Sequence, residues 1–216
     1  MKKIGIFLLL AVLSIVGLFA AANDSISTVY KDGVFISQYR CKVNVSEKVI
    51  DEVTNDLVSD FHSSSSNLFN WALKDLGLQN EGNELIIILK SSNHDVKTGI
   101  THGLFDIEVP YFKTFSDIKV DAIVSKTKNS NGVTKVSANI IYSSLLLKNG
   151  LAILYVIPQK NNELIFFTNV TIRFGWFFNI FITKRRYKSI VEWRIKQFTE
   201  NMRLECIKRE KLASKK

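Results

Sequence analysis

The stretch KRRYKSIVEWRIKQFTENMRLECIKREKL, from Lys184 to Leu212, decides the fold that this sequence predicts. It contains neither proline nor glycine, and its apolar residues recur every three or four positions, the spacing that places side chains on one face of an α-helix. A second apolar set lies on the roughly opposite face, so we expect this helix to be buried on both sides or to dock one face on a partner or a membrane. The first face consists of Tyr187, Val191, Ile195, Phe198, Met202 and Cys206, and the second of Ile190, Trp193, Leu204 and Ile207.

The N-terminus has the features of a signal peptide. Two lysines precede the uncharged apolar run Ile4 to Phe19, and Ala20 to Ala22 then supplies the small residues that signal peptidase requires. We therefore predict a signal peptide at 1–22, a single α+β domain at 23–216, and export to the periplasm or the outside of the cell. The alternative is an uncleaved membrane anchor, because Ile4 to Ala22 is just long enough to span a bilayer.

Positive charge is concentrated at the C-terminal end. The whole chain has a formal charge of +9, whereas Lys184 to Lys216 contains twelve Lys or Arg against four Glu, a balance of +8, and Asn23 to Thr183 carries −1. Nucleic acid attracts basic segments, but an exported protein seldom meets it, and no strand pairs exposed aromatics with Lys or Arg as base-stacking platforms do. We expect no nucleic-acid partner, which leaves a solvated face or an anionic lipid surface.

Between the signal peptide and the C-terminal helix, apolar and polar residues alternate in most segments. This pattern is typical of half-buried strands in an antiparallel sheet. The run 85–89 is continuously apolar and predicts a central strand, whereas 23–32 is expected to be a loose lead-in. Turn signals recur with no helix between the later strands, which predicts antiparallel meanders. The expected strands are 34–45, 85–89, 104–111, 118–124, 136–142, 151–157 and 164–174, with two short helices at 46–61 and 66–76 after the first strand.

This order of elements resembles the helix-grip architecture of the START and Bet v 1-like superfamily, in which a curved seven-stranded antiparallel sheet wraps a C-terminal helix. The resemblance covers 34–212 and is one of element order, with no family sequence motif. It implies an α+β fold with a cavity between the sheet and the C-terminal helix; the runner-up is a different α+β sandwich with helices on one face of an antiparallel sheet. The ligand-facing residues that it implies are Tyr142, Phe166, Phe174, Val191, Ile195, Phe198 and Met202.

An aromatic run precedes the basic helix. The segment FGWFFNIFI, from Phe174 to Ile182, is followed at once by three basic residues. Aromatic rings beside basic side chains suit an anionic membrane interface, but the same rings would also fill the core under the helix. The candidate interface residues are Trp176, Phe177, Phe178, Arg185, Arg186 and Trp193.

The sequence has two cysteines, Cys41 on the inward face of the first predicted strand and Cys206 on the first face of the C-terminal helix. Export permits a disulfide between them. Two buried free thiols that act as small apolar side chains are the equal alternative.

No catalytic or metal motif stands out. The histidines His62, His94 and His102 match no metal-binding spacing, and the sequence assembles no Ser-His-Asp or Cys-His set and no glycine-rich phosphate loop. We expect no metal and no cofactor. An enzyme would need an inward polar group such as Tyr142, Tyr155 or His102 with a perturbed pKa.

The sequence supports two hypotheses of function. The first is an exported, non-enzymatic binding protein for an apolar or amphipathic small molecule or lipid, held between the sheet and the C-terminal helix. The alternative is an envelope-surface or assembly protein that uses the basic helix and the Phe174 to Ile182 run as a membrane or partner interface.

Overall fold

The computed structural model describes residues 26–63, 65–76, 86–109, 113–159 and 163–215. The predicted signal peptide at 1–22 lies outside these ranges. The strands are β1 (Ile26–Lys31), β2 (Val34–Val43), β3 (Ile86–Asp95), β4 (Ile100–Val109), β5 (Lys113–Lys128), β6 (Thr134–Ser143), β7 (Leu147–Pro158) and β8 (Leu164–Phe174). The helices are α2 (Glu47–Ser63), α3 (Ser65–Leu68), α4 (Trp176–Phe181), α5 (Lys184–Tyr187), the π-helical turn η2 (Lys188–Glu192) and α6 (Trp193–Ala213).

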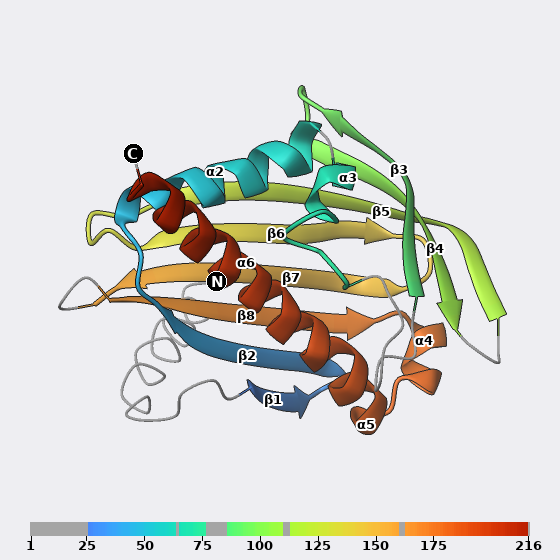
Figure 1. Ribbon diagram of the computed structural model, residues 1–216. Coiled ribbons are helices and arrows are strands. Elements are labelled where there is room, and N and C mark those ends of the chain that lie inside the picture. Colours follow the sequence, from blue (N-terminus) through green and yellow to red (C-terminus); the bar gives the residue numbers. More distant parts are fainter. Residues whose placement is uncertain (1–25, 64, 77–85, 110–112, 160–162, 216) are drawn as a thin grey trace, which may run out of the picture.

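One curved antiparallel sheet of eight strands carries the helices on one face (Figure 1). Its order is β1-β2-β8-β7-β6-β5-β4-β3. The C-terminal helix runs as α5, η2 and α6 and packs on β2 and β8, while α2 covers β5. The α+β helix-grip fold expected from the sequence is thus confirmed, with eight strands rather than seven. In the described ranges, no helix combines the length and the apolar character needed to cross a membrane.

The additional strand is β1, where the sequence analysis expected a loose lead-in. Asp32 and Gly33 both have positive φ, 52° and 77°. Two such residues in succession form the tight turn whose twist matches that of paired strands, so β1 folds back on β2 as a hairpin. The Asp32-Gly33 pair is the sequence feature that could have predicted this hairpin.

The apolar run at 85–89 was wrongly predicted to lie in a central strand. Residue 85 is outside the described ranges, and β3 lies at the edge of the sheet. Leu89 packs inward under α3 while Ile88 is 43% exposed. A bulge between Leu89 and Ser91, and the ion pairs of Lys90 with two aspartates, give this edge the features that discourage pairing with another chain.

The C-terminal helix is fastened to the sheet at its N-terminal end by a chain of hydroxyl groups. Tyr187 is fully buried, and its hydroxyl hydrogen-bonds to that of Ser37 at 2.8 Å, which in turn bonds to Thr28 at 2.8 Å. The Tyr187 ring stacks on Phe35 with centroids 4.0 Å apart. Burial raises the pKa of Tyr187 to about 12, so the hydroxyl stays protonated and links α5 to β2 and β1.

Further polar contacts follow along the same helix. The Thr199 hydroxyl bonds to that of Thr168 on β8 at 2.8 Å, and both are buried. At the far end, the backbone N–H and the hydroxyl of Ser46 donate to Glu210 at 2.9 and 2.7 Å. These bonds lower the pKa of the Glu210 carboxyl. The helix is therefore held along its whole length.

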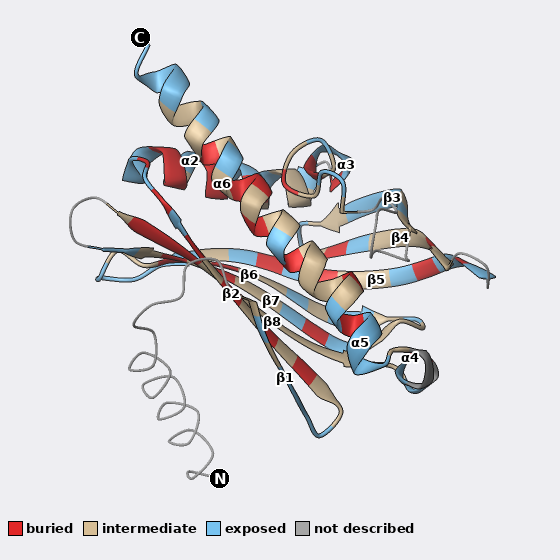
Figure 2. Ribbon diagram, turned by 60° about the horizontal axis from the view of Figure 1, so that its bottom comes forward, coloured by how far each residue is buried: buried red, intermediate tan, exposed pale blue. Residues whose placement is uncertain are grey.

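The two apolar faces of the C-terminal helix have different surroundings. Figure 2 shows buried positions recurring along α6 and the strands it covers, and on the first face Ile195, Met202 and Cys206 are buried. On the second face Ile190 is buried, whereas Leu204 is 55% exposed. The second face is thus only partly covered.

Removal of the Tyr187 hydroxyl, in Tyr187→Phe, is expected to lower the free energy of unfolding by about 1 kcal/mol, because a buried hydrogen bond is lost while the ring packing is kept. Urea denaturation measures the loss. Tyr142→Phe is the matched control, since that side chain is 49% exposed. An equal loss in both variants would contradict the role of the hydroxyl chain.

Candidate functional site

An apolar pocket lies between the sheet and the segment that contains α3. Its volume is about 80 Å³. We call it the α3 pocket. Its walls are mainly aromatic and aliphatic, with three hydroxyl side chains among them. They are Phe61, Ser65, Leu68, Phe69 and Leu73 from the helical side and Leu89, Ser92, Thr101, Gly103, Phe105, Val120 and Ala122 from β3, β4 and β5.

The C-terminal helix holds the cover of this pocket in place. Asn201 Nδ2 donates to the backbone carbonyls of Ala72 and Lys74 at 3.2 and 2.9 Å, and Arg194 Nε donates to that of Leu76 at 2.9 Å. Burial lowers the pKa of Arg194 to about 10, which leaves it charged at neutral pH. The turn that follows α3 is therefore tied to α6 on one side and faces the pocket on the other.

A larger, open groove lies beside the α3 pocket. It measures about 600 Å³, and six of its eight lining residues have polar side chains, although most of the exposed lining surface is apolar. We call it the histidine groove. Its lining is Asn55, Val58, Ser59, His62 and Ser63 from α2, with His94, Val96 and Lys126 from the sheet side.

A stacked pair of histidines stands between the two spaces. The rings of His62 and His94 have centroids 4.1 Å apart and an interplanar angle of 21°. His94 Nδ1 lies 2.9 Å from the hydroxyl of Thr101, which lines the α3 pocket. His62 follows Phe61, another lining residue. The pair thus contributes to the wall that the pocket and the groove share.

The electrostatics of the pair favour a neutral His62 ring. Burial lowers the pKa of His62, and the neighbouring His94 lowers it further, while a hydrogen bond to the backbone of Val124 acts in the opposite direction. The Nε2 atom of His62 is buried and has no hydrogen-bond partner among the described residues. Protonation of both rings would place two like charges about 4 Å apart.

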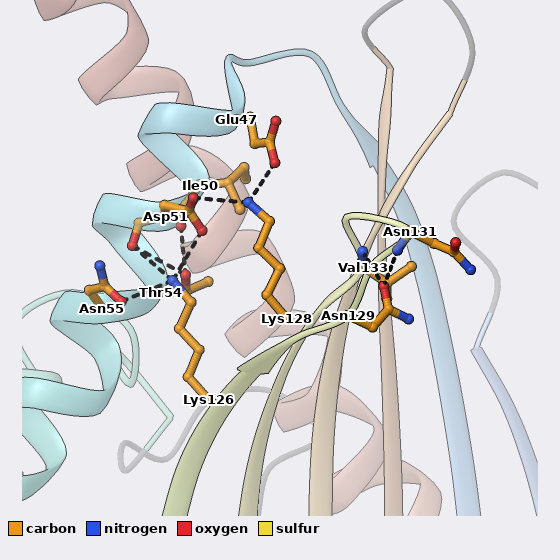
Figure 3. A network of polar contacts seen from close by, with 10 residues as sticks. All are labelled: Glu47, Ile50, Asp51, Thr54, Asn55, Lys126, Lys128, Asn129, Asn131 and Val133. Carbon is orange, nitrogen blue, oxygen red and sulfur yellow. Dashed lines mark hydrogen bonds and ion pairs between the residues drawn. The ribbon is translucent and has the colours of Figure 1, made fainter.

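Two lysines of β5 fix α2 above the groove (Figure 3). Lys126 Nζ donates to the Asp51 carboxylate at 3.1 Å and to Asn55 Oδ1 at 2.9 Å, and Lys128 Nζ donates to Asp51 at 3.1 Å. Burial raises the pKa of Asp51, but the hydrogen bonds from Lys128 and Lys126 outweigh it, so the pKa lies below its usual value. The charge of Lys126 is thereby balanced by Asp51.

The residues predicted to face a ligand lie elsewhere. Phe166, Ile195 and Met202 are buried in the main core, and Val191 and Phe198 pack against it. Phe174 belongs to a second core cluster. No residue of the predicted set contributes to the α3 pocket or the histidine groove.

Tyr142 was wrongly expected to face inward. It lies opposite Asp121, whereas Ile140 lies opposite the buried Ala122, so the register slips by one residue between them. A one-residue slip moves a side chain to the other face of the sheet. Tyr142 is consequently exposed.

The predicted interface residues are divided between surface and core. Trp176 is 80% exposed, and Arg185 and Arg186 are also exposed. Phe178 is buried against Phe115, with centroids 5.2 Å apart, and so cannot form an interface. Trp193 is partly buried, and the Phe177 side chain is outside what the structure describes.

The cysteines are free thiols in the structure, and both are buried. Cys41 and Cys206 belong to the same core cluster. Burial raises the pKa of Cys206 to about 12. A thiol with such a pKa is a poor nucleophile and packs as a small apolar side chain.

The polar residues considered for catalysis lie away from both spaces. Tyr155 stacks on Phe167, with centroids 6.0 Å apart, and alternates with the buried Leu154 and Val156. His102 is exposed and pairs with Asp121 at 2.8 Å. The described ranges contain no group of three or more His, Cys, Asp or Glu that could hold a metal ion.

Sequence reasoning missed both the α3 pocket and the histidine pair. His62 and His94 come from α2 and β3, and nothing in their spacing brings them together. The pocket depends on where α3 settles on β4 and β5. The Phe105 ring fills the space beside Gly103, so the small Ala122 on β5 is the sequence feature that could have indicated room there.

No protein-family model matches the sequence, and no curated protein matches it. Several solved structures share the path of the chain. A fragment of a STAR-related lipid transfer protein from Xanthomonas axonopodis has 10% identity and a TM-score of 0.46, covering 85% of this chain and 99% of that one. A conserved protein from Geobacillus kaustophilus has 12% identity and a TM-score of 0.48, covering 80% and 95%.

Truncated norcoclaurine synthase from Thalictrum flavum has 12% identity and a TM-score of 0.38, covering 84% of this chain and 98% of that one. At this level of identity, the similarity concerns the fold alone. The fold assignment therefore rests on the sheet and helices themselves.

Replacement of His62 by phenylalanine is expected to flatten the dependence of stability on pH. Because the pKa of His62 is lower in the folded chain than its usual value of about 6.5, the unfolded chain binds more protons, and stability falls as the pH falls through that value. We expect the urea midpoint to drop less between about pH 7 and about pH 5 in His62→Phe than in the wild type. His102→Gln, on the other face of the sheet, should keep the contribution of His62. Equal slopes in His62→Phe and the wild type would refute this.

Proposed function

We propose that this protein binds a small apolar or amphipathic molecule whose apolar part enters the α3 pocket. The observation that carries the proposal is the lining of that pocket, which is mainly aromatic and aliphatic and comes from two helices and three strands. Binding sites for small molecules are concave and mostly apolar, with few polar groups. The α3 pocket has this character.

The volume limits what can enter. About 80 Å³ is well above what one water molecule needs, about 10–15 Å³, but below the roughly 300–1,000 Å³ of sites that enclose a whole drug-sized ligand. The α3 pocket therefore suits the end of an aliphatic chain or a small ring. Expansion would require movement of the turn that follows α3.

The histidine groove supplies a place for a polar group of the same molecule. Because the wall formed by His62 and His94 separates the two spaces, we propose that one ligand passes this wall, with its apolar part in the α3 pocket and its polar part in the open groove. Imidazole nitrogens can form hydrogen bonds with a hydroxyl or a carboxylic acid. This arrangement favours an amphipathic ligand over a purely apolar one.

The proposed ligand site differs from the one that the resemblance implied, between the sheet and the C-terminal helix. The first face of the C-terminal helix packs directly on β2 and β8, with Ile195 and Met202 buried among strand side chains.

The protein is proposed to bind without catalysis. Export with removal of 1–22 is part of the proposal, and the mass of the protein recovered outside the cytoplasm checks it.

A second candidate function is docking on a membrane or a partner. The exposure of Trp176 next to the basic residues of α5 favours it. The two functions are compatible, because the α3 pocket and α5 lie on different parts of the fold.

Filling the α3 pocket is expected to weaken binding. Ala122 is 6% exposed and lines the pocket, so Ala122→Leu should place its larger side chain in the space that the ligand uses. Isothermal titration with decanoate should show an affinity at least about tenfold lower than that of the wild type, a change of about 1.4 kcal/mol.

Ile123→Leu is the matched control, because that side chain points to the other face of the sheet and is 37% exposed. It should bind decanoate like the wild type. Unchanged affinity in Ala122→Leu, or no decanoate binding by the wild type, would contradict the proposal.

A further inference from the structure

One end of the molecule gathers segments that are far apart in the sequence. The end of β8 leads into α4 and α5, and Arg173 Nη2 donates to the carbonyl of Asp32 in the β1–β2 turn at 2.9 Å. Lys184 lies over the ring of Tyr30, 5.2 Å from its centroid. Phe178 packs on Phe115 near the start of β5. We call this end the α5 pole.

Exposed basic side chains dominate the α5 pole. They come from three separate segments, and the acidic residues of the same region are Asp32, Glu108 and Glu192. The exposed basic residues are Lys31, Lys113, Lys184, Arg185, Arg186 and Lys188.

Trp176 projects from the same pole. The backbone next to it is held closely against the preceding hairpin. Gly175 approaches the preceding hairpin so closely that a Cβ there would lie 2.8 Å from the carbonyl oxygen of Leu145. The Gly175 N–H donates to the Leu146 carbonyl at 3.1 Å. With Phe178 buried on the inner side of α4, Trp176 is left 80% exposed. The burial of Phe178 thus fixes the position of an exposed indole.

We infer that the α5 pole is a docking face for an anionic lipid surface. Tryptophan prefers the depth of the lipid headgroups, where its ring meets the acyl boundary and its N–H meets water. Basic side chains around it bind phosphates of anionic lipids, each contributing about fivefold to partitioning. The inference narrows the second candidate function to one surface and one partner, and it does not depend on ligand binding in the α3 pocket.

A lipid surface fits this face better than other polyanions do. A single exposed indole that projects from a short helix inserts into a soft interface. Nucleic acid would call for several exposed aromatics along a groove, and the buried Phe178 and Phe115 cannot supply them. An acidic protein partner would need an apolar centre on this face that is larger than the ring of Trp176.

The test measures partitioning of the full chain onto phosphatidylcholine vesicles with and without phosphatidylglycerol. The variants are Trp176→Ala and the double reversal Arg185→Glu with Lys188→Glu. The matched control is the reversal Lys211→Glu with Lys215→Glu, which changes the net charge equally at the other end of the C-terminal helix (Figure 1). All proteins share the same N-terminus, so any contribution from Ile4 to Ala22 is common to them, and equal urea midpoints confirm that each is folded.

The wild type is expected to bind only the vesicles that contain phosphatidylglycerol, and to release when salt rises from about 0.1 M to about 1 M, because the screening length falls from about 10 Å to about 3 Å. At about 0.1 M salt, the double reversal at the pole should weaken partitioning at least about twentyfold, and Trp176→Ala should weaken it as well. The control reversal should retain most of the binding.

Three results would overturn the inference. They are absence of vesicle binding by the wild type, equal losses in the pole and control reversals, and binding to duplex DNA or heparin that depends on the pole while vesicles are ignored. The last would assign the same face to a different polyanion. Decanoate titration of the same variants reports on the α3 pocket separately.

Discussion

The packing of the C-terminal helix against β2 and β8 is the constraint on which the rest of the structure depends. It begins with the buried hydroxyl chain through Tyr187 and Ser37 and ends with the contact of Glu210 and Ser46. Between them, polar pairs such as Thr168 and Thr199 fix the helix in position, because a buried hydroxyl without its partner is costly. Apolar burial supplies most of the stability, and the hydroxyl pairs specify one register.

This fixed helix determines where the protein can change shape. Asn201 and Arg194 donate hydrogen bonds to backbone carbonyls of the turn after α3. The C-terminal helix therefore supports the pocket cover. The cover itself consists of one short helix and a turn, which the buried Leu68 and Ala72 attach to the main core. Because this segment is short and lies at the periphery of the fold, we expect it to open locally at lower cost than the sheet and α6 do. Ligand entry is therefore expected to move the cover and leave the helix in place.

The sequence predicted those features that depend on local spacing. The three- and four-residue spacing between Tyr187 and Cys206 correctly predicts a helix with one buried face, and the order of elements predicts the helix-grip fold. Features that depend on register or on contacts between distant segments were not predictable. The slip beside Tyr142, the edge position of β3 and the stacking of His62 on His94 all arise from how strands and helices meet in space.

Hydrogen–deuterium exchange with and without decanoate tests whether a fixed C-terminal helix supports a movable pocket cover. We expect amides of 65–76 to exchange through local opening and to be slowed by decanoate, whereas amides of α6 should exchange only with global unfolding and respond little. Rapid exchange throughout α6, or protection by decanoate confined to α6, would contradict it.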